Sequence, residues 1–151
     1  MLAEAESMSR EEAGFEHLTV AVECGGSDSF SGLTANPTVG IAADWVVAQG
    51  GCVLLSETTE LIGTEKLVSA RIQDPQVLEK FDDLMLRQRA KVNSGLGEAA
   101  SSVISPGNQE GGLTSILEKA LGCVRKGGST AIRDVIEYAE RPQRKGLVIM
   151  D

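Results

Sequence analysis

Apolar residues gather in two short runs that flank a stretch with helical spacing. Residues 18–23 (LTVAVE) are rich in β-branched side chains, and residues 52–55 (CVLL) form an unbroken apolar run. Both patterns predict strands, and the second is typical of a strand buried on both faces. Between them, the apolar positions from Val39 to Val47 recur at helical spacing, with Asn36 as the expected cap and Pro37 at the first helical position. This order predicts a right-handed βαβ unit.

The rest of the chain predicts further helices and one more strand. Residues 75–92 carry apolar side chains at helical spacing directly after Asp74, a favourable capping residue. Residues 113–126 and 130–139 are expected to form two more helices. Residues 145–150 (KGLVIM) form another continuous apolar run, which predicts a third parallel strand.

These elements together predict an α/β fold, Rossmann-like and three-layered, with a partial parallel sheet. Residues 17–151 are expected to form this domain, preceded by an Ala- and Glu-rich helical connector over residues 1–16. Residues 93–112 have no periodicity and are expected to be a long, poorly ordered loop. Because a buried strand rarely ends a domain of this type, the chain is expected to be a fragment truncated at its C-terminus.

Composition and charge argue against several classes of protein. Hydrophobic residues make up 42% of the 151 positions, which is enough for one core, and the net charge of −8 argues against binding to nucleic acid. No apolar run is long enough to cross a membrane, and the acidic N-terminus does not resemble a signal peptide. The three widely spaced cysteines suggest neither a disulfide framework nor a Cys-x-x-Cys metal site. We therefore expect a cytoplasmic protein with no nucleic-acid or membrane partner.

Polar side chains follow each predicted strand. They are Cys24, Ser27 and Asp28 after the first, Ser56, Glu57 and Glu60 after the second, and Asp151 after the third. Parallel strands bring their carboxyl ends to one edge of a sheet, where ligands bind in folds of this kind. Carboxylates and hydroxyls suit a hard divalent cation or a polyol, and the Cys24 thiol adds a softer ligand for iron or manganese.

Each of these residues also has a purely structural interpretation. Asp28, in a loop of glycine and serine, has the character of a turn residue that binds its own backbone. Glu57 and Glu60 have the character of residues that complement the dipole of a helix beginning there. Cys52 and Cys123 lie in apolar stretches, and we expect both in the core.

Four blocks of sequence carry a resemblance to a known family. They are CGGSDSFSGLTANPTVG (residues 24–40), SETTELIGTE (56–65), SPGNQEGGLTSILEKALG (105–122) and KGLVIMD (145–151). In this order and spacing they resemble the altronate and galactarate dehydratases. The resemblance covers nearly all of the chain from Leu18 onward and is specific to the family, although not to one substrate.

The resemblance implies a hydro-lyase that dehydrates an altronate-like sugar acid to a 2-keto-3-deoxy acid, with Fe²⁺ or Mn²⁺ as the divalent metal. Enzymes of this family are larger, so the implied partners are the remaining domains of the same enzyme or a small partner subunit, and the isolated fragment is expected to be inactive. Two alternatives remain. One is a sulfolactate sulfo-lyase of the same superfamily, which expels sulfite, and the other is a noncatalytic module that binds a sugar acid or a nucleotide.

The residue types and the resemblance together give the candidate site. The expected catalytic residues are Asp28, Glu57 and Glu60, and the expected metal ligands are Cys24 and Asp28. The residues expected to bind the substrate are Ser27, Ser31, Thr34, Asn36, Asn108, Gly111 and Gly112. The glycine pair precedes a predicted helix, where free backbone N–H groups can approach a substrate carboxylate.

The two interpretations of Asp28 are separated by the substitution Asp28→Asn in the intact enzyme. An isosteric change at an exposed position costs under about 0.5 kcal/mol, so the melting temperature is expected to stay unchanged. Turnover at saturating metal should fall sharply if Asp28 binds metal or substrate, since a neutral amide is a poor ligand for a hard cation. Unchanged turnover would identify Asp28 as a turn residue, and an equal loss of stability and turnover would make it structural.

Overall fold

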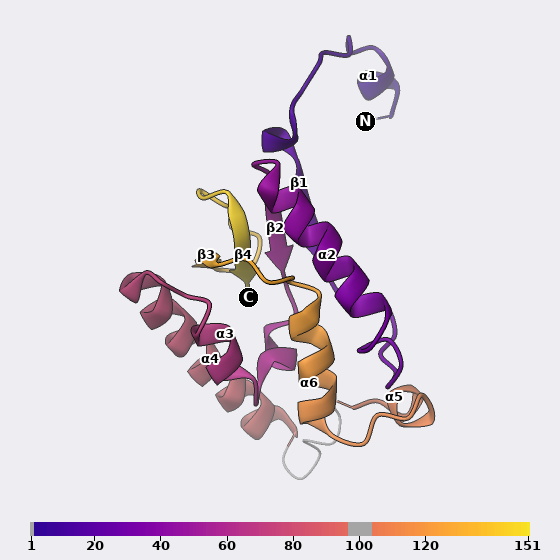
Figure 1. Cartoon of the computed structure of the whole chain (residues 1–151), viewed down its shortest axis with the longest axis vertical. Helices are drawn as coiled ribbons and strands as arrows, with labels where there is room; N and C mark the ends of the chain where they lie inside the picture. Colours follow the sequence, from indigo (N-terminus) through magenta and orange to yellow (C-terminus); the bar gives the residue numbers. More distant parts are fainter. Residues whose placement is uncertain (1, 97–103) are drawn as a thin grey trace.

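A computed structural model describes residues 2–96 and 104–151 of the chain (Figure 1). Its strands are β1 (Thr19–Val22), β2 (Cys52–Leu55), β3 (Ile132–Ile136) and β4 (Gly146–Met150). They form one sheet in the order β1-β2-β4-β3, and every neighbouring pair is parallel. The predicted α/β class, the parallel sheet and the three predicted strands are therefore confirmed.

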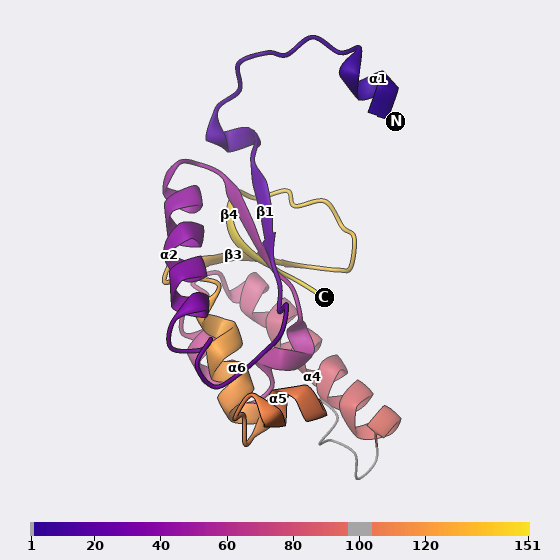
Figure 2. The ribbon, with the colours of Figure 1, turned by 90° about the vertical axis from the view of Figure 1, so that its right-hand side faces the viewer.

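Helices fill most of the intervening chain. They are α1 (Leu2–Glu6), α2 (Ala35–Ala48), α3 (Glu65–Ser69), α4 (Pro75–Leu96), α5 (Pro106–Glu110) and α6 (Ile116–Arg125), with two 3-10 turns, η1 (Phe15–His17) and η2 (Thr58–Leu61). Helices α2 and α6 lie side by side, and η2 contacts both α4 and α6 (Figure 1). Helix α1 stands away from the body of the molecule in both views (Figure 2). Across the described residues, no helix combines the length and the apolar character that spanning a membrane requires.

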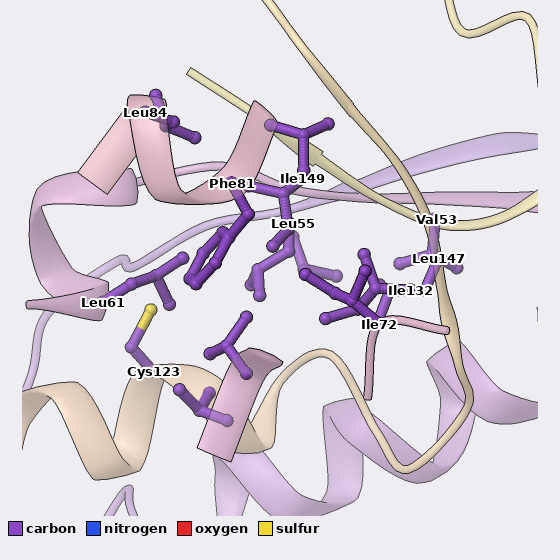
Figure 3. Close-up of a cluster of buried hydrophobic side chains, with 14 of the residues drawn as sticks. Val53, Leu55, Leu61, Ile72, Phe81, Leu84, Cys123, Ile132, Leu147 and Ile149 are labelled. Carbon is purple, nitrogen blue, oxygen red and sulfur yellow. The ribbon is translucent and has the colours of Figure 1, made fainter. Parts of the chain in front are cut away.

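The two faces of the sheet carry separate apolar clusters. The odd-numbered residues of β2 and β4 face the larger cluster, which also takes in side chains of α2, α4, η2 and α6. In its centre Phe81 of α4 lies close to Leu55 and Leu61 (Figure 3). The even-numbered residues on the other face form a smaller cluster that, within the described chain, consists of strand residues alone. The described chain thus supplies the sheet and a layer of helices on one face.

The expected helix over residues 130–139 is wrong, because this segment contains strand β3. A β-bulge explains the misleading pattern: Ile132 pairs with Leu147, whereas Asp134 pairs with the next residue of β4, so Arg133 is an extra residue. The bulge brings Ile132 and Val135 to the same face of the sheet although they are three positions apart. Two apolar residues three positions apart also share one face of a helix, so the sequence pattern of this strand resembles that of a helix.

The predicted cap of the first long helix is also wrong. Helix α2 begins at Ala35, its N-cap position is Thr34, and no side chain caps it. The amide of Asn36 instead donates a hydrogen bond to the carbonyl oxygen of Gly122 in α6 at 3.0 Å. The side chain that was expected to cap the start of α2 therefore links α2 to α6.

The expected loop over residues 93–112 is shorter than predicted. Helix α4 continues to Leu96, and α5 occupies Pro106–Glu110 with a capping box between Ser105 and Asn108. The expectation of poor order falls in part on residues 97–103, which lie outside the described residues. The predicted cap of α4 is confirmed, since Asp74 accepts a hydrogen bond from the backbone N–H of Gln76 at 3.0 Å.

Helix α2 approaches α6 closely enough that one contact requires glycine. A Cβ atom at Gly40 would overlap the carbonyl oxygen of Arg125 at the end of α6. One turn further along α2, Asp44 accepts hydrogen bonds from the backbone N–H groups of Ser129 and Thr130, at 2.8 and 3.1 Å. The half-buried side chain of Arg71 donates hydrogen bonds to the carbonyl oxygens of Gly127 and Thr130, each at 2.8 Å. These contacts fix the turn that leads from α6 into β3.

The substitution Gly40→Ala tests this contact. Because the added methyl group must push α2 and α6 apart, we expect the free energy of unfolding to fall by about 2 kcal/mol, measured by urea denaturation. Gly107→Ala in α5 is the matched control, since the nearest atom to a Cβ there is Ser105 Oγ at 3.9 Å. Equal stability of the two variants would mean that α2 and α6 tolerate a wider separation.

Candidate active site

The carboxyl ends of three neighbouring strands meet at one edge of the sheet, as the parallel topology predicted. The hydroxyl of Ser56, after β2, donates to the carbonyl oxygen of Val22 at the end of β1 at 3.3 Å. On the other side, the hydroxyl of Thr58 donates to Oδ1 of Asp151, after β4, at 3.2 Å. The loops that leave β1, β2 and β4 are therefore bonded to one another, and His17 lies at the opposite end of β1.

Three potential metal ligands converge between the first two of these loops. One ligand atom each from Cys24, Glu57 and Glu60 lies within 4.8 Å of the others, and all three side chains are partly shielded from solvent. The hydroxyl of Ser27 contacts the thiol of Cys24. The structure thus brings together Cys24, Ser27, Glu57 and Glu60, four of the residues that were expected at this edge. We refer to Cys24, Glu57 and Glu60 as the ligand cluster.

Two lysines enter the same site, Lys119 on α6 and Lys126 at the position that caps its C-terminus, and sequence analysis did not find them. Lys126 Nζ lies 2.9 Å from Glu57 Oε2, and Lys119 Nζ lies 2.6 Å from Glu60 Oε1. The Lys126 and Lys119 side chains are only 4% and 11% exposed. One signal was available: two turns of helix separate these residues, and both fall on the stripe of α6 that contains the buried Cys123. Charged residues on an apolar stripe indicate a buried partner.

The lysines oppose the repulsion between the two carboxylates. Two like charges about 5 Å apart repel by about 3 kcal/mol at the effective dielectric of a protein. Burial raises the pKa of Glu57 above its ordinary value, the hydrogen bond from Lys126 lowers it, and the charge of Glu60 raises it again. Burial is the largest single effect on the pKa of Lys126 and lowers it, but the hydrogen bond to Glu57 and the nearby negative charges together outweigh burial, so that the pKa is raised overall. Lys126 therefore stays a cation in this setting.

Two features of the site are unusual and lie next to each other. Oε2 of Glu60 is buried and has no hydrogen-bond partner among the described residues. Glu57 adopts the left-handed backbone conformation, with φ 69° and ψ 50°, which residues with a Cβ atom rarely occupy. Both features are the kind that a bound ligand explains: an orphaned acceptor needs a partner, and backbone strain gathers at functional sites.

Asp28 lies at the same edge, but its Oδ1 faces its own loop. That oxygen accepts hydrogen bonds from the backbone N–H groups of Phe30 and Ser31, at 2.8 and 2.7 Å. Asn108 supports the loop from the other side by donating to the carbonyl oxygen of Ser27 at 2.9 Å. The contact with Gly111 is close, because a Cβ atom there would lie 2.7 Å from that of Asp28.

The other residues expected to bind the substrate have partners within the protein. The hydroxyl of Ser31 donates to the carbonyl oxygen of Asp28 at 2.9 Å, and that of Thr34 to Phe30 at 3.0 Å. Asn36 binds Gly122, and Gly112 adopts φ +89° beside Ser29. These contacts build the frame of the site, and direct contact of these residues with a substrate stays a prediction.

Comparison with known proteins now adds to this geometry. Residues 15–151 match the family model described as D-galactarate/altronate dehydratase, C-terminal. The chain belongs to this family. The fold described above is therefore that of a C-terminal region of the galactarate/altronate dehydratase family.

The proteins to which this member of the galactarate/altronate dehydratase family is similar are named for different reactions. The chain is 36% identical to altronate dehydratase of Bacillus subtilis and 39% identical to galactarate dehydratase (L-threo-forming) of Escherichia coli, over 93% and 92% of its length. It is 41% identical, over 97% of its length, to the (2R)-sulfolactate sulfo-lyase subunit beta of Chromohalobacter salexigens. The chain spans only 28%, 26% and 38% of these three proteins.

The three cysteines of this family member should differ in reactivity. Cys52 and Cys123 are each 1% exposed, and burial raises the pKa of both, that of Cys123 to about 12. The thiol of Cys123 therefore stays protonated at any pH below about 12 and is a poor nucleophile. Iodoacetamide at pH 8 should label the partly exposed Cys24 first, as read by peptide mass spectrometry. Labelling of Cys123 at the same rate in the folded protein would contradict its burial.

Proposed function

We propose that this chain forms one wall of the active site of a hydro-lyase that removes water from a sugar acid to give a 2-keto-3-deoxy acid. Family membership supports the reaction class, because the altronate and galactarate dehydratases among its relatives carry that activity in their names. The observation that carries the assignment of the site is the buried, unpartnered Oε2 of Glu60 within the ligand cluster. An orphaned carboxylate oxygen beside a thiol and a second carboxylate is suited to a cation.

The residues present fit a divalent cation such as Fe²⁺ or Mn²⁺. Cys24, Glu57 and Glu60 supply one sulfur and two carboxylate groups, a donor set that suits iron or manganese better than calcium or magnesium. In this proposal Glu57 and Glu60 replace Asp28 as the carboxylate ligands, since Oδ1 of Asp28 is bound to its own loop. When bound, the cation would supply Lewis-acid chemistry that withdraws electrons from a substrate carboxylate or hydroxyl.

The chain's own residues position this site for dehydration. The reaction breaks a C–H bond next to the carboxylate and a C–O bond at the following carbon, and a C=C bond and water form. The resulting enol then takes a proton at that following carbon and becomes the 2-keto-3-deoxy acid. Lys126 binds one oxygen of Glu57, and Lys119 binds one oxygen of Glu60. These two contacts fix the directions of the carboxylates. Ser27 holds the thiol of Cys24. We assign the acceptor of the substrate proton to the part of such enzymes that this chain does not span.

A sulfo-lyase is the second candidate. Its support is the 41% identity to the sulfolactate sulfo-lyase subunit, over nearly the whole chain. The same first step, loss of the proton next to a carboxylate, serves both reactions, and only the leaving group differs. A sulfo-lyase would release sulfite where a dehydratase releases water.

Turnover of altronate, galactarate and (2R)-sulfolactate by the intact protein tests the proposal. We expect a 2-keto-3-deoxy acid from at least one sugar acid, with activity lost after treatment with EDTA and restored by Fe²⁺ or Mn²⁺. Release of sulfite from sulfolactate alone would select the second candidate. Binding of a sugar acid without any turnover would make the protein a noncatalytic module.

The substitution Glu60→Gln links the activity to the site. Outer partners of metal ligands typically contribute about 10- to 100-fold to activity, and we expect a ligand to contribute at least as much. Turnover at saturating metal should therefore fall by about 100-fold or more while the far-UV circular dichroism stays unchanged. Glu79→Gln, at an exposed position of α4, is the matched control and should keep full activity. Full activity of both variants would remove Glu60 from the site.

A further inference from the structure

The ligand cluster and its two lysines form an electrically balanced group. Glu57 pairs with Lys126, and Glu60 pairs with Lys119. None of these four side chains is more than 15% exposed. Two negative and two positive charges cancel, so the group is neutral before any ligand enters. This balance matters because an uncompensated charge is costly to bury.

The stability of the fold does not account for two buried lysines at this site. Replacing a buried ion pair with apolar residues of similar size is often neutral or stabilising, so packing alone does not explain two such pairs side by side. Two turns of α6 separate Lys119 from Lys126, and each ammonium binds one carboxylate of the same cluster. Their shared property is the positive charge that they bring to a site suited to a cation.

A divalent cation would upset the balance. The cation would add two positive charges. Cys24 would offset at most one of them, by binding as a thiolate. Since both lysines stay bonded to the same carboxylates, the loaded site would carry at least one positive charge in excess. An anion in the site would restore neutrality. Without the lysines, the two carboxylates alone would neutralise the cation.

We propose that Lys119 and Lys126 couple the binding of the cation to the binding of the substrate's anionic group, so that each ligand binds more tightly in the presence of the other. This inference rests on the proposed function, which supplies both the cation and an acidic substrate. Such coupling is reciprocal: the factor by which the anion tightens the cation equals the factor by which the cation tightens the anion. The two lysines thus select charged acids over neutral polyols.

Mn²⁺ binding to the intact protein tests the coupling without turnover. The free ion is followed by electron paramagnetic resonance, with L-tartrate as the anionic probe and threitol as its uncharged counterpart on the same carbon skeleton. We expect tartrate to lower the Kd for Mn²⁺ by about tenfold or more, within the usual range of coupling between two sites. Threitol should leave the Kd unchanged, since it offers the same hydroxyls without the charge.

Variants assign the effect to the lysines. Lys119→Met and Lys126→Met should bind Mn²⁺ alone more tightly, because a repelling charge is gone, and tartrate should then change the Kd by less than about twofold. Lys126→Arg keeps the charge and should retain the coupling. Lys66→Met, at an exposed position of α3, is the matched control and should behave like the unsubstituted protein. Circular dichroism identifies any variant that fails to fold.

Three results would overturn the inference: no binding of Mn²⁺, no effect of tartrate on the unsubstituted protein, or an effect of tartrate that persists in both methionine variants. The first two results are measured on the unsubstituted protein, so the inference can be refuted even if the variants fail to fold. Coupling in a protein that dehydrates no sugar acid would refute the proposed function and support the coupling. Dehydration without coupling would refute only the role of the lysines.

Discussion

The close packing of α2 against α6 sets the geometry of the candidate site. Gly40 lets the two helices approach until backbone touches backbone, and the amide of Asn36 closes the contact at Gly122. Helix α6 is thereby held beside η2, where its lysines reach the two carboxylates. A helix held only slightly further away would leave Lys119 and Lys126 short of their partners. The electrostatics of the site therefore depend on a contact between small groups that bind neither carboxylate themselves.

Ion pairs in this protein fall into two kinds with different consequences. On α4, Arg87 forms two hydrogen bonds with Glu137, at 2.6 and 3.0 Å, but both side chains are about half exposed. Solvent screens such a pair, which typically contributes less than about 1 kcal/mol to stability. The pairs on α6 are buried, so their charges act strongly on one another and on any ligand that enters. Only the buried kind can determine what the site binds.

Local pattern and parallel topology were enough to predict much of this molecule. The unbroken apolar runs of β2 and β4 identify strands, and the rule that parallel strands end at one edge brings Cys24 close to Glu57. Strand β3 could not be predicted, because its bulge gives the apolar residues of the strand the spacing of a helix. Lys119 and Lys126 were also missed: their position on the apolar stripe of α6 indicates a buried partner, but the identity of that partner depends on how α6 lies against η2. That arrangement comes from tertiary packing, which the order of polar and apolar residues does not specify.

The left-handed conformation of Glu57 has a consequence for how this sequence can evolve. A residue with a Cβ atom costs about 1–2 kcal/mol in that conformation, and glycine would relieve most of that strain. Glycine, however, would bring no carboxylate to Lys126 or to the ligand cluster. Selection for stability alone would therefore drive position 57 toward glycine, and selection for chemistry would hold the acid in place. At this position stability and activity are in direct competition, as is common where a protein binds its ligand.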